Sequence, residues 1–300
     1  MKKVSVIGLR GHAERLIERI ESHEKAELSY IYLNREDSHP KVTKDFNNLL
    51  KSDGIIISSP TQTHKEYLSK LKDYEGHIFC EKPITLDPNI LNSLKGSKLS
   101  SKLFVNYCFE FSPVGSFLYE LVTSNELGKL SNISMQTGHN GAYKFNDDDW
   151  RFGSYGGILN TVLSHFICYL YKINASLEIT NMTQLSQTNK GNDTTAISGF
   201  MDNNTLIYIF GSWASHPFFN IQFNFEKGGV SWDGKQLNVD PYRDDIPEYL
   251  KKITIQENFN MSLDLSLDCF IDGMYKNQQD RDFLSRSLKT EELLISFNKK

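Results

Sequence analysis

The hydrophobic positions of the first hundred residues form short runs that alternate with helical patterns. An apolar run at residues 4–7 ends at Gly8, and apolar residues then recur at helical spacing up to residue 20. Further strands are predicted at residues 28–33, 54–60, 77–80 and 103–107. Strands that alternate with helices indicate a doubly wound parallel sheet, so residues 1–107 are predicted to form a Rossmann-type dinucleotide-binding domain.

Two helix starts within this region carry local signals. The segment Thr63-His64-Lys65-Glu66 has the form of a capping box, and Asp87-Pro88 places a good N-cap before a proline. Helices are therefore predicted to begin at these two points.

The pattern changes after residue 107, where longer alternating strands are joined by short polar turns such as residues 202–204. Strands are predicted at residues 130–137, 177–185, 194–201, 205–213 and 218–225, and helices at 117–122, 157–172 and 263–274. Residues 108–300 are expected to form an α+β domain with a large, mostly antiparallel open sheet, for substrate binding and oligomerisation. Two positions are open for its C-terminal helix, which packs either within this domain or back against the first domain.

The open sheet has a consequence for assembly. Its alternating strands must cover two faces, and an exposed face that carries Phe, Tyr, Ile and Trp would be a natural subunit interface. A homodimer or homotetramer formed through this sheet is expected.

Composition narrows the class of partner. The chain has 300 residues, 23% of them charged, and a net charge of −4, so it lacks the basic field that binds nucleic acid or an anionic membrane. A small-molecule partner is expected instead. The four cysteines show no CxxC spacing, which predicts neither a metal site nor a disulfide scaffold. With no signal-peptide pattern and no run of transmembrane length, a cytoplasmic protein is expected.

The turn after the first strand resembles the dinucleotide fingerprint G-x-G-x-x-G/A. It reads Gly8-Leu9-Arg10-Gly11-His12-Ala13, so the first glycine and the closing alanine fit, while Arg10 replaces the second glycine. A side chain there must swing away from the pyrophosphate or contact a phosphate itself. An ordinary turn between a strand and a helix is the alternative.

The end of the second strand bears on the choice of cofactor. A carboxylate at this position binds the ribose hydroxyls and repels a 2′-phosphate, but here Asn34 is followed by Arg35. An amide beside a guanidinium favours NADP modestly over NAD. The alternative is that Arg35 is a solvated surface charge or stacks on adenine.

Motifs further along the chain resemble a known family. They are Ser58-Ser59-Pro60-Thr61-x-Thr63-His64, then Cys80-Glu81-Lys82-Pro83, then Trp150-Arg151 before Gly156-Gly157, with His165 eight residues on. In this order and spacing they resemble the glucose-fructose oxidoreductase, inositol dehydrogenase and MocA-type family of NAD(P)-dependent oxidoreductases. The resemblance implies a Rossmann domain followed by a mixed sheet whose open face often mediates oligomers.

The resemblance also implies roles for residues. Lys82 would lie beside the nicotinamide, where an ammonium can hold a substrate hydroxyl, with Glu81 and Pro83 fixing the backbone. Without the family, Lys82 reads as a surface lysine. Together, the glycine turn, the end of the second strand and the family motifs give these candidate cofactor-binding residues: Gly8, Arg10, Gly11, His12, Ala13, Asn34, Arg35, Ser58, Ser59, Pro60, Thr61, Thr63, His64, Glu81 and Lys82.

The candidate catalytic residues are Lys82, His165 and Thr161. Where the family usually has an aspartate four residues before the histidine, on one helical face, this chain has Thr161. A histidine ionises near neutral pH and can take a proton from an alcohol, whereas a threonine can only orient the substrate. Two further departures are Leu163 in place of a glycine and Glu110 in place of an arginine.

Substrate-side candidates are Trp150, Arg151, Thr161 and His165. An indole and a guanidinium could stack on a sugar ring and bind its hydroxyls, and a structural salt-bridged anchor is the alternative for this pair, which follows the acidic residues 147–149. His139, Asn140 and Tyr143 are further candidates from their position alone.

The predicted function is hydride transfer between a nicotinamide cofactor, NADP or NAD, and a sugar, sugar derivative or cyclic polyol. The alternative is a non-catalytic regulatory or sensor protein of the same fold that binds the dinucleotide as a signal.

Overall fold

The computed structural model describes residues 1–146, 148–153, 155–202, 204–256 and 260–298. The chain forms two units, one made of Met1–Tyr107 with Leu263–Lys300 and the other of Cys108–Ser262. The first unit thus takes residues 263–300, which the sequence analysis placed in the second domain. Each unit is described separately below.

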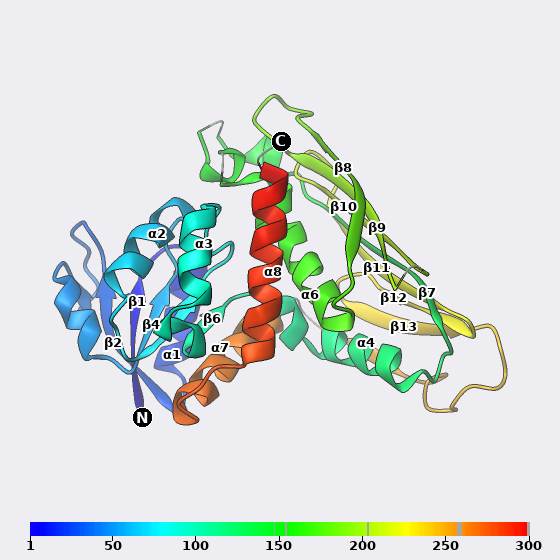
Figure 1. Cartoon of the computed structure of the whole chain (residues 1–300), viewed down its shortest axis with the longest axis horizontal. Coiled ribbons are helices and arrows are strands. Elements are labelled where there is room, and N and C mark those ends of the chain that lie inside the picture. Colours follow the sequence, from blue (N-terminus) through cyan, green and yellow to red (C-terminus); the bar gives the residue numbers. More distant parts are fainter. Residues whose placement is uncertain (147, 154, 203, 257–259, 299–300) are drawn as a thin grey trace. The chain divides into compact units, whose positions relative to one another are not determined.

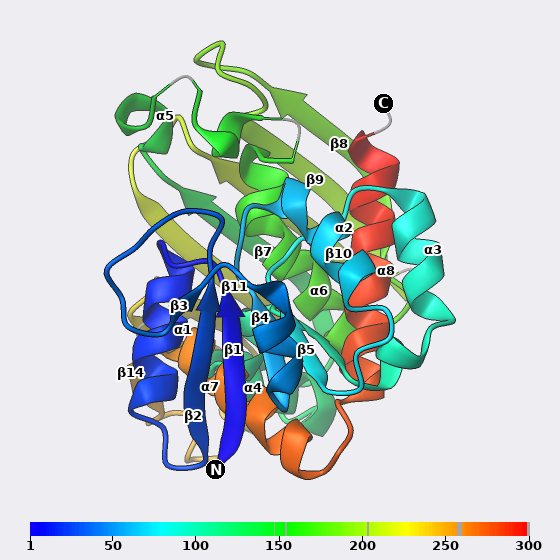
Figure 2. The ribbon, with the colours of Figure 1, turned by 90° about the vertical axis from the view of Figure 1, so that its left-hand side faces the viewer.

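The first unit is built on a six-stranded sheet in the order β3-β2-β1-β4-β5-β6, and every neighbouring pair is parallel (Figure 2). This is the strand order of dinucleotide-binding Rossmann folds. The triple isoleucine of β4 is completely buried, as the sequence pattern predicts. The strands are β1 (Lys2–Ile7), β2 (Ala26–Tyr32), β3 (Val42–Thr43), β4 (Gly54–Ile57), β5 (His77–Cys80) and β6 (Leu103–Val105).

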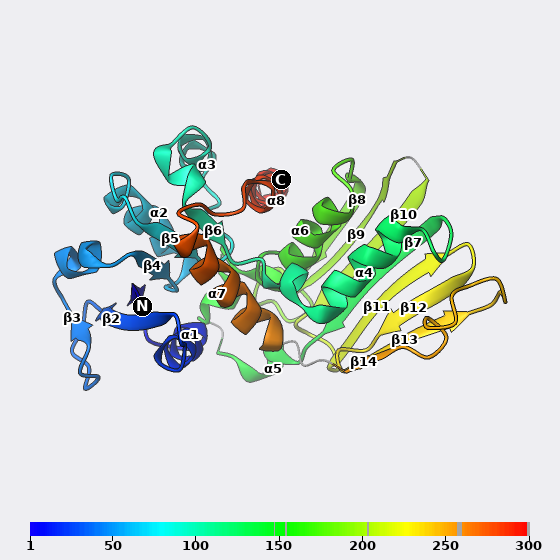
Figure 3. The same cartoon turned by 90° about the horizontal axis from the view of Figure 1, so that it is seen from below.

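Helices cover both faces of this sheet. Figure 3 shows α1 and α7 on one face and α2 and α3 on the other. The helices are α1 (His12–Glu21), α2 (Thr61–Lys70), α3 (Pro88–Lys95), α7 (Asn260–Tyr275) and α8 (Arg281–Asn298), with short 3-10 segments η1 (Phe46–Lys51) and η2 (Lys98–Ser101). Asp87 caps α3 as predicted, whereas α2 begins at Thr61 with Pro60 as its N-cap, two residues before the predicted capping box.

Aromatic packing explains why the C-terminal segment belongs to the first unit. Phe270 of α7 packs edge-on against Phe79 and Phe104 of β5 and β6, at centroid distances of 5.5 and 6.1 Å. Phe283 of α8 lies 4.8 Å from Phe104. Because all four rings are buried, these two helices complete the core of the Rossmann unit.

Three ion pairs at helical spacing also join α7 to α1 and the loop after it. Arg15 contacts Asp264 at 3.2 Å, Arg19 contacts Asp268 at 2.9 Å, and Lys25 contacts Asp272 at 2.8 Å. The acidic residues recur every four positions, so they line one side of α7.

The second unit is built on an eight-stranded sheet in the order β14-β13-β12-β11-β7-β10-β9-β8. Strands β7 and β10 are parallel and the other neighbours are antiparallel. The strands are β7 (Leu130–Gly138), β8 (Glu178–Leu185), β9 (Thr194–Met201), β10 (Thr205–Ser212), β11 (Phe218–Phe225), β12 (Gly228–Trp232), β13 (Gln236–Pro241) and β14 (Thr254–Gln256). The last three strands were not predicted.

Helices α4 (Pro113–Ser124) and α6 (Ser164–Ile173) lie on one face of this sheet (Figures 1 and 3). Shorter segments are η3 (Cys108–Phe111), α5 (Gly141–Lys144), η4 (Trp150–Phe152) and the π-helical turn η5 (Leu159–Leu163). Ile207 and Trp232 are buried, and Trp232 stacks on Phe109 of η3. Leu206 and Tyr208 alternate with the buried positions and are 66% and 42% exposed.

Candidate functional site

The carboxyl ends of four adjoining strands meet at one edge of the Rossmann sheet. Ser58, Glu81 and Asn106 follow β4, β5 and β6, and the backbone N–H of each donates to the last carbonyl of the neighbouring strand, at 3.0, 2.9 and 2.9 Å. Gly8 follows β1 at the same edge. Ligands of open α/β sheets bind at this end of the strands, so the predicted glycine turn and the Lys82 motif are brought to one edge.

The glycine turn fits a pyrophosphate. Gly8 has a φ of 114°, and a Cβ there would lie only 2.5 Å from the carbonyl oxygen of Ser58, so a side chain has no room. Gly11 has a φ of 61°, and a Cβ there would meet nothing within 4 Å, which leaves open space over the turn. No side chain caps the start of α1 at His12, so its first N–H groups can bind phosphate oxygens. Arg10, in the place of the second glycine, is exposed.

Glu81 is buried and held by two partners. Asn106 donates to its carboxylate at 2.9 Å, and His12 lies 3.8 Å away. Ser266 of α7 donates in turn to Asn106 at 2.9 Å. Burial opposes ionisation of Glu81, but its contacts with His12 and Asn106 and the charge of Lys82 lower its pKa below the ordinary value. Glu81 is therefore a fixed negative charge beside the Lys82 backbone.

Lys82 is half-buried, and its peptide bond to Pro83 is cis. The segment after it is held from two sides. Nδ1 of His64 lies 3.1 Å from the Pro83 carbonyl, and the Ile84 N–H donates to Glu291 of α8 at 2.8 Å. The sequence analysis did not single out Glu291 or Asn106. No local signal marked Glu291, but the position of Asn106 after the last predicted strand could have drawn attention to it.

His64 and Thr61, two of the candidate cofactor-binding residues, are buried. His64 is fully buried, and its Nε2 lies 2.9 Å from the Ser59 carbonyl, so both ring nitrogens face backbone oxygens. Burial lowers the pKa of His64, while the two carbonyls oppose that shift. Thr61 is only 5% exposed. His64 joins the loops after β4 and β5, which carry Ser59 and Pro83.

Thr63 binds within its own loop. Its hydroxyl donates to the Pro60 carbonyl and lies 2.7 Å from the hydroxyl of Ser59. Ser58 and Ser59 are half-buried, and Pro60 is exposed. These residues shape the turn above β4, next to Gly8.

Asn34 and Arg35 are exposed at the end of β2. The Arg35 guanidinium lies 3.7 Å from Asp37 and is 49% exposed. An exposed ion pair at this distance contributes little to stability, so Arg35 can bind another anion in place of Asp37.

In the second unit, Trp150 and Arg151 lie in η4 and have different surroundings. Nη1 of Arg151 contacts both carboxylate oxygens of Asp149 at 3.0 and 2.9 Å, and its guanidinium lies 4.3 Å from the centre of the Phe145 ring. These are the contacts of a structural anchor. Trp150 is 42% exposed and presents an indole to the solvent. Residue 147 of the acidic segment and residue 203 of the predicted turn lie outside the described residues.

The predicted regular helix over residues 157–172 is interrupted. A π-helical turn spans Leu159–Leu163, and α6 begins at Ser164. The Thr161 hydroxyl donates at 2.5 Å to the Gly157 carbonyl, an acceptor that would take a backbone N–H in an α-helix. The four-residue spacing between Thr161 and His165 therefore runs from the π turn into the first turn of α6. Single π turns of this kind are frequent at functional sites.

His165 is buried at 8% exposure, and its Nδ1 lies 3.9 Å from the thiol of Cys108. The two departures from the family pattern have local partners. Leu163 fills space left by Gly211 of β10, where a Cβ would lie 2.7 Å from its Cδ2. Glu110 is buried, and Lys172 of α6 lies 3.9 Å from its carboxylate.

The additional candidates lie around α5. His139 stacks at 4.9 Å on Trp213, and burial lowers its pKa, while its Nε2 lies 3.1 Å from the Thr137 hydroxyl. Tyr143 is 70% exposed, and Asn140 precedes α5 at half-buried exposure.

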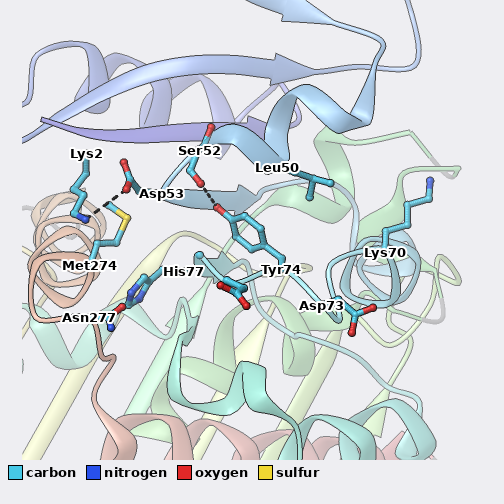
Figure 4. Close-up of a pocket in the computed structure, with 12 residues that line it drawn as sticks. Lys2, Leu50, Ser52, Asp53, Lys70, Asp73, Tyr74, His77, Met274 and Asn277 are labelled. Atoms are coloured by element: carbon cyan, nitrogen blue, oxygen red, sulfur yellow. Dashed lines mark hydrogen bonds and ion pairs between the residues drawn. The ribbon is translucent and has the colours of Figure 1, made fainter.

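A hollow of about 540 Å³ lies at the opposite edge of the Rossmann sheet, where β1, β4 and β5 begin (Figure 4). Its lining groups pair with one another: Lys2 contacts Asp53 at 3.5 Å, and Tyr74 donates to the Ser52 carbonyl at 2.7 Å. None of the candidate residues lines it, so it is separate from the site described above.

Two features, a metal-binding cluster and a membrane-spanning helix, are absent from the residues that the structure describes. Across those ranges, no group of His, Cys, Asp and Glu is arranged to hold a metal ion. Within the same part of the chain, no helix has the length and apolar character needed to cross a membrane.

Comparisons with known proteins agree with this architecture. A glucose-6-phosphate 3-dehydrogenase of Bacillus subtilis (strain 168) is 26% identical over 162 residues, which are 50% of this chain and 46% of that protein. The chain spans less than half the length of the curated relatives that it matches.

Two solved structures share the fold over nearly the whole chain. A 3-ketoreductase from Actinomadura kijaniata, in complex with NADP and TDP-benzene, has a TM-score of 0.83 at 15% identity and covers 98% of this chain and 95% of its own. A levoglucosan dehydrogenase, in complex with NADH and levoglucosan, has a TM-score of 0.82 at 12% identity and covers 99% and 95%.

The family comparison covers the Rossmann unit. Residues 2–105 match the model described as an oxidoreductase family with an NAD-binding Rossmann fold, which bears the names of glucose-fructose oxidoreductase, inositol dehydrogenase and MocA. The resemblance predicted from the motifs is confirmed: the Rossmann unit matches the Gfo/Idh/MocA oxidoreductase family model, and a curated relative is a dehydrogenase of a sugar phosphate.

Proposed function

We propose that this protein is an NAD(P)-dependent oxidoreductase that transfers hydride between the nicotinamide and a carbon of a sugar, sugar derivative or cyclic polyol. The observation that carries the proposal is the meeting of the glycine turn and the Glu81-Lys82-Pro83 motif at one edge of the family-matched sheet. The relatives described above, a dehydrogenase of a sugar phosphate, a ketoreductase and a levoglucosan dehydrogenase, support the enzyme rather than the sensor.

The residues that would hold the dinucleotide are those whose geometry fits it. Gly8 and Gly11 leave room for the pyrophosphate, the start of α1 donates to it, and Arg10 can add a charge-assisted contact. When bound, the nicotinamide accepts or supplies the hydride. Asn34 and Arg35 favour NADP through the 2′-phosphate, in competition with Asp37.

The chain's own side chains would handle the substrate. Lys82 holds a substrate hydroxyl, while the nearby carboxylate of Glu81 keeps its surroundings negative. His165 takes the hydroxyl proton through Nε2, since its Nδ1 faces the Cys108 thiol. The exposed indole of Trp150 offers a stacking surface for a sugar ring, and Arg151 and Thr161 support that loop and helix.

The same proposal covers domain roles, assembly and location. Residues 108–262 would bind the substrate and form a homodimer or homotetramer through the outward face of their sheet, where Leu206 and Tyr208 are exposed. The protein would work in the cytoplasm, where cysteine side chains stay reduced.

A panel assay tests the proposal. Reduced-cofactor absorbance is followed with NADP and NAD against sugars, sugar phosphates, inositols and anhydrosugars, in both reaction directions. Specific turnover of at least one compound is expected. Tight dinucleotide binding without turnover of any of them would instead support the sensor alternative.

A further inference from the structure

A buried glutamate of the C-terminal helix reaches the segment that carries Lys82. Glu291 of α8 is completely buried, and its Oε1 accepts two hydrogen bonds. The donors are the backbone N–H of Ile84, at 2.8 Å, and the hydroxyl of Tyr107, at 2.7 Å. Ile84 lies two residues after Lys82, and Tyr107 follows Asn106, which holds Glu81. The consecutive residues Asn106 and Tyr107 thus bind two carboxylates. One belongs to Glu81, which precedes Lys82, and the other to Glu291, which contacts the backbone after Lys82.

This carboxyl group lies in an unusual environment for an acid. Its Oε2 is buried and has no hydrogen-bond partner among the described residues. Burying a carboxylate with one of its two oxygen atoms unsatisfied costs folding free energy. Groups of this kind are often found at functional sites. Burial raises the pKa of Glu291 to about 7, against the opposing effects of Ile84, Tyr107 and the charge of Lys82. The group therefore changes its charge within the physiological pH range.

The titratable groups that interact with Glu291 lie at the ends of the two neighbouring strands. They are Lys82 after β5, Tyr107 after β6 and Cys80 at the end of β5, whose pKa is raised by burial and then by the charges of Glu291 and Glu81. His64 of α2 lies 3.7 Å from the Cys80 thiol, and burial lowers its pKa. Lys82 is the cation among these groups, so its electrostatic interaction energy changes most when Glu291 gains or loses a proton.

We infer that Glu291 is a positioning residue for Lys82, acting through the Ile84 N–H and the Tyr107 hydroxyl. As a carboxylate, it holds both donors by charge-assisted hydrogen bonds and places a negative charge near the ammonium. Once protonated, it holds them more weakly, and the charge is gone. This role rests on the function proposed above, because that function assigns Lys82 to the substrate. It also brings a carboxyl group to the segment that carries Lys82, in a chain that has Thr161 where the family has an aspartate.

The first test needs neither substrate nor cofactor. Infrared spectra of the parent protein are recorded across pH 5 to 9, in comparison with Glu291→Gln and Glu292→Gln. Glu292 is the next residue on α8 and pairs with Lys95 at the surface, so it is the matched control. We expect a protonated-carboxyl band that titrates near neutral pH in the parent and in E292Q, and that is missing in E291Q. A parent without such a band would overturn the inference.

The second test uses turnover of whichever compound the panel assay identifies. Gln keeps an acceptor for Ile84 and Tyr107 but cannot ionise, so E291Q should fold and should lose the part of the kcat profile that titrates near neutral pH. We expect kcat to fall about tenfold at pH 8, which is comparable with losing one hydrogen bond to a charged group. E292Q should keep the parent profile. If E291Q also keeps it, the inference fails while the proposed function stands; if the panel yields no turnover, the proposed function fails and the infrared test still decides the charge of Glu291.

Discussion

The thiol of Cys108 lies 3.9 Å from Nδ1 of His165, at the start of the helix that follows the π turn. Under the proposed function, His165 takes the proton of the substrate hydroxyl. Replacing His165 by alanine should therefore lower turnover by two or more orders of magnitude and leave dinucleotide binding intact, in line with the usual worth of a general base. Steady-state kinetics and titration calorimetry measure the two quantities.

Lys82→Met is the companion variant, and it should damage both substrate affinity and turnover. Near-parental turnover of His165→Ala across the active pH range would show that the base is another group, with Lys82 and Tyr155 the next to examine.

Gly8 leaves no room for a side chain between the first turn and the Ser58 carbonyl. Gly8→Ala should weaken binding of NADPH and NADH by at least tenfold, because the new Cβ forces the turn out of position at a positive φ. Gly96→Ala is the control, since a Cβ there meets nothing within 4 Å and its φ is negative. Unchanged affinity of Gly8→Ala would mean that the turn does not hold the dinucleotide.

The cofactor preference depends on Arg35. Calorimetry should show NADPH binding about tenfold more tightly than NADH, and Arg35→Ala should erase that difference, because a 2′-phosphate loses a charge-assisted contact. Arg10→Ala is expected to weaken both cofactors alike, since the proposed contact of Arg10 is with the phosphates that they share. Equal affinities in the parent would contradict this assignment.

The outward face of the second sheet should be the subunit interface. Leu206→Glu places a charge at a residue that is 66% exposed, and it should convert a dimer or tetramer into a monomer in light scattering. Leu50→Glu changes an equally apolar residue, 43% exposed in the Rossmann unit, and should leave the mass unaltered. A parent protein that is monomeric at micromolar concentration would end this proposal.

Glu291 also makes stability depend on pH. Its pKa rises from an ordinary 4.5 to about 7 on folding, so the folded state binds the proton more tightly. The stabilisation is present in full below pH 4.5 and is lost as the pH rises through 7, by an amount on the order of 3 kcal/mol. Urea unfolding at pH 5 and pH 8 should show this loss in the parent and a smaller one in Glu291→Gln. The same loss in both proteins would place the titration elsewhere.

Much of the fold could be predicted because its signals are local. The strands at residues 77–80, 194–201 and 218–225 agree with β5, β9 and β11, since buried runs and strict alternation have no other common interpretation. Strands β12 to β14 were missed because Gly228 and Gly229, followed by a polar stretch, are typical of turns. Strand β12 pairs with β11, which lies earlier in the chain, and β13 and β14 are added in turn beyond β12.

The site was less predictable because its decisive contacts are distant in sequence. Glu291 stands beside Glu292 in an ordinary helix, and no local pattern distinguishes the buried carboxylate from the exposed one. His64 carries a family motif, but its two carbonyl partners come from separate loops. Leu163 stands where the family has a glycine, and the residue that leaves room for its side chain is Gly211, which is distant in sequence.

The Rossmann unit is assembled from both ends of the chain, and this sets an order on synthesis. Residues 1–107 leave the ribosome first, with Phe79 and Phe104 on a face of the sheet that α7 and α8 later cover. Those helices are made only after the whole of the second unit. The aromatic face of the nascent sheet therefore stays uncovered until α7 and α8 have been synthesised, and during that interval it is exposed to aggregation.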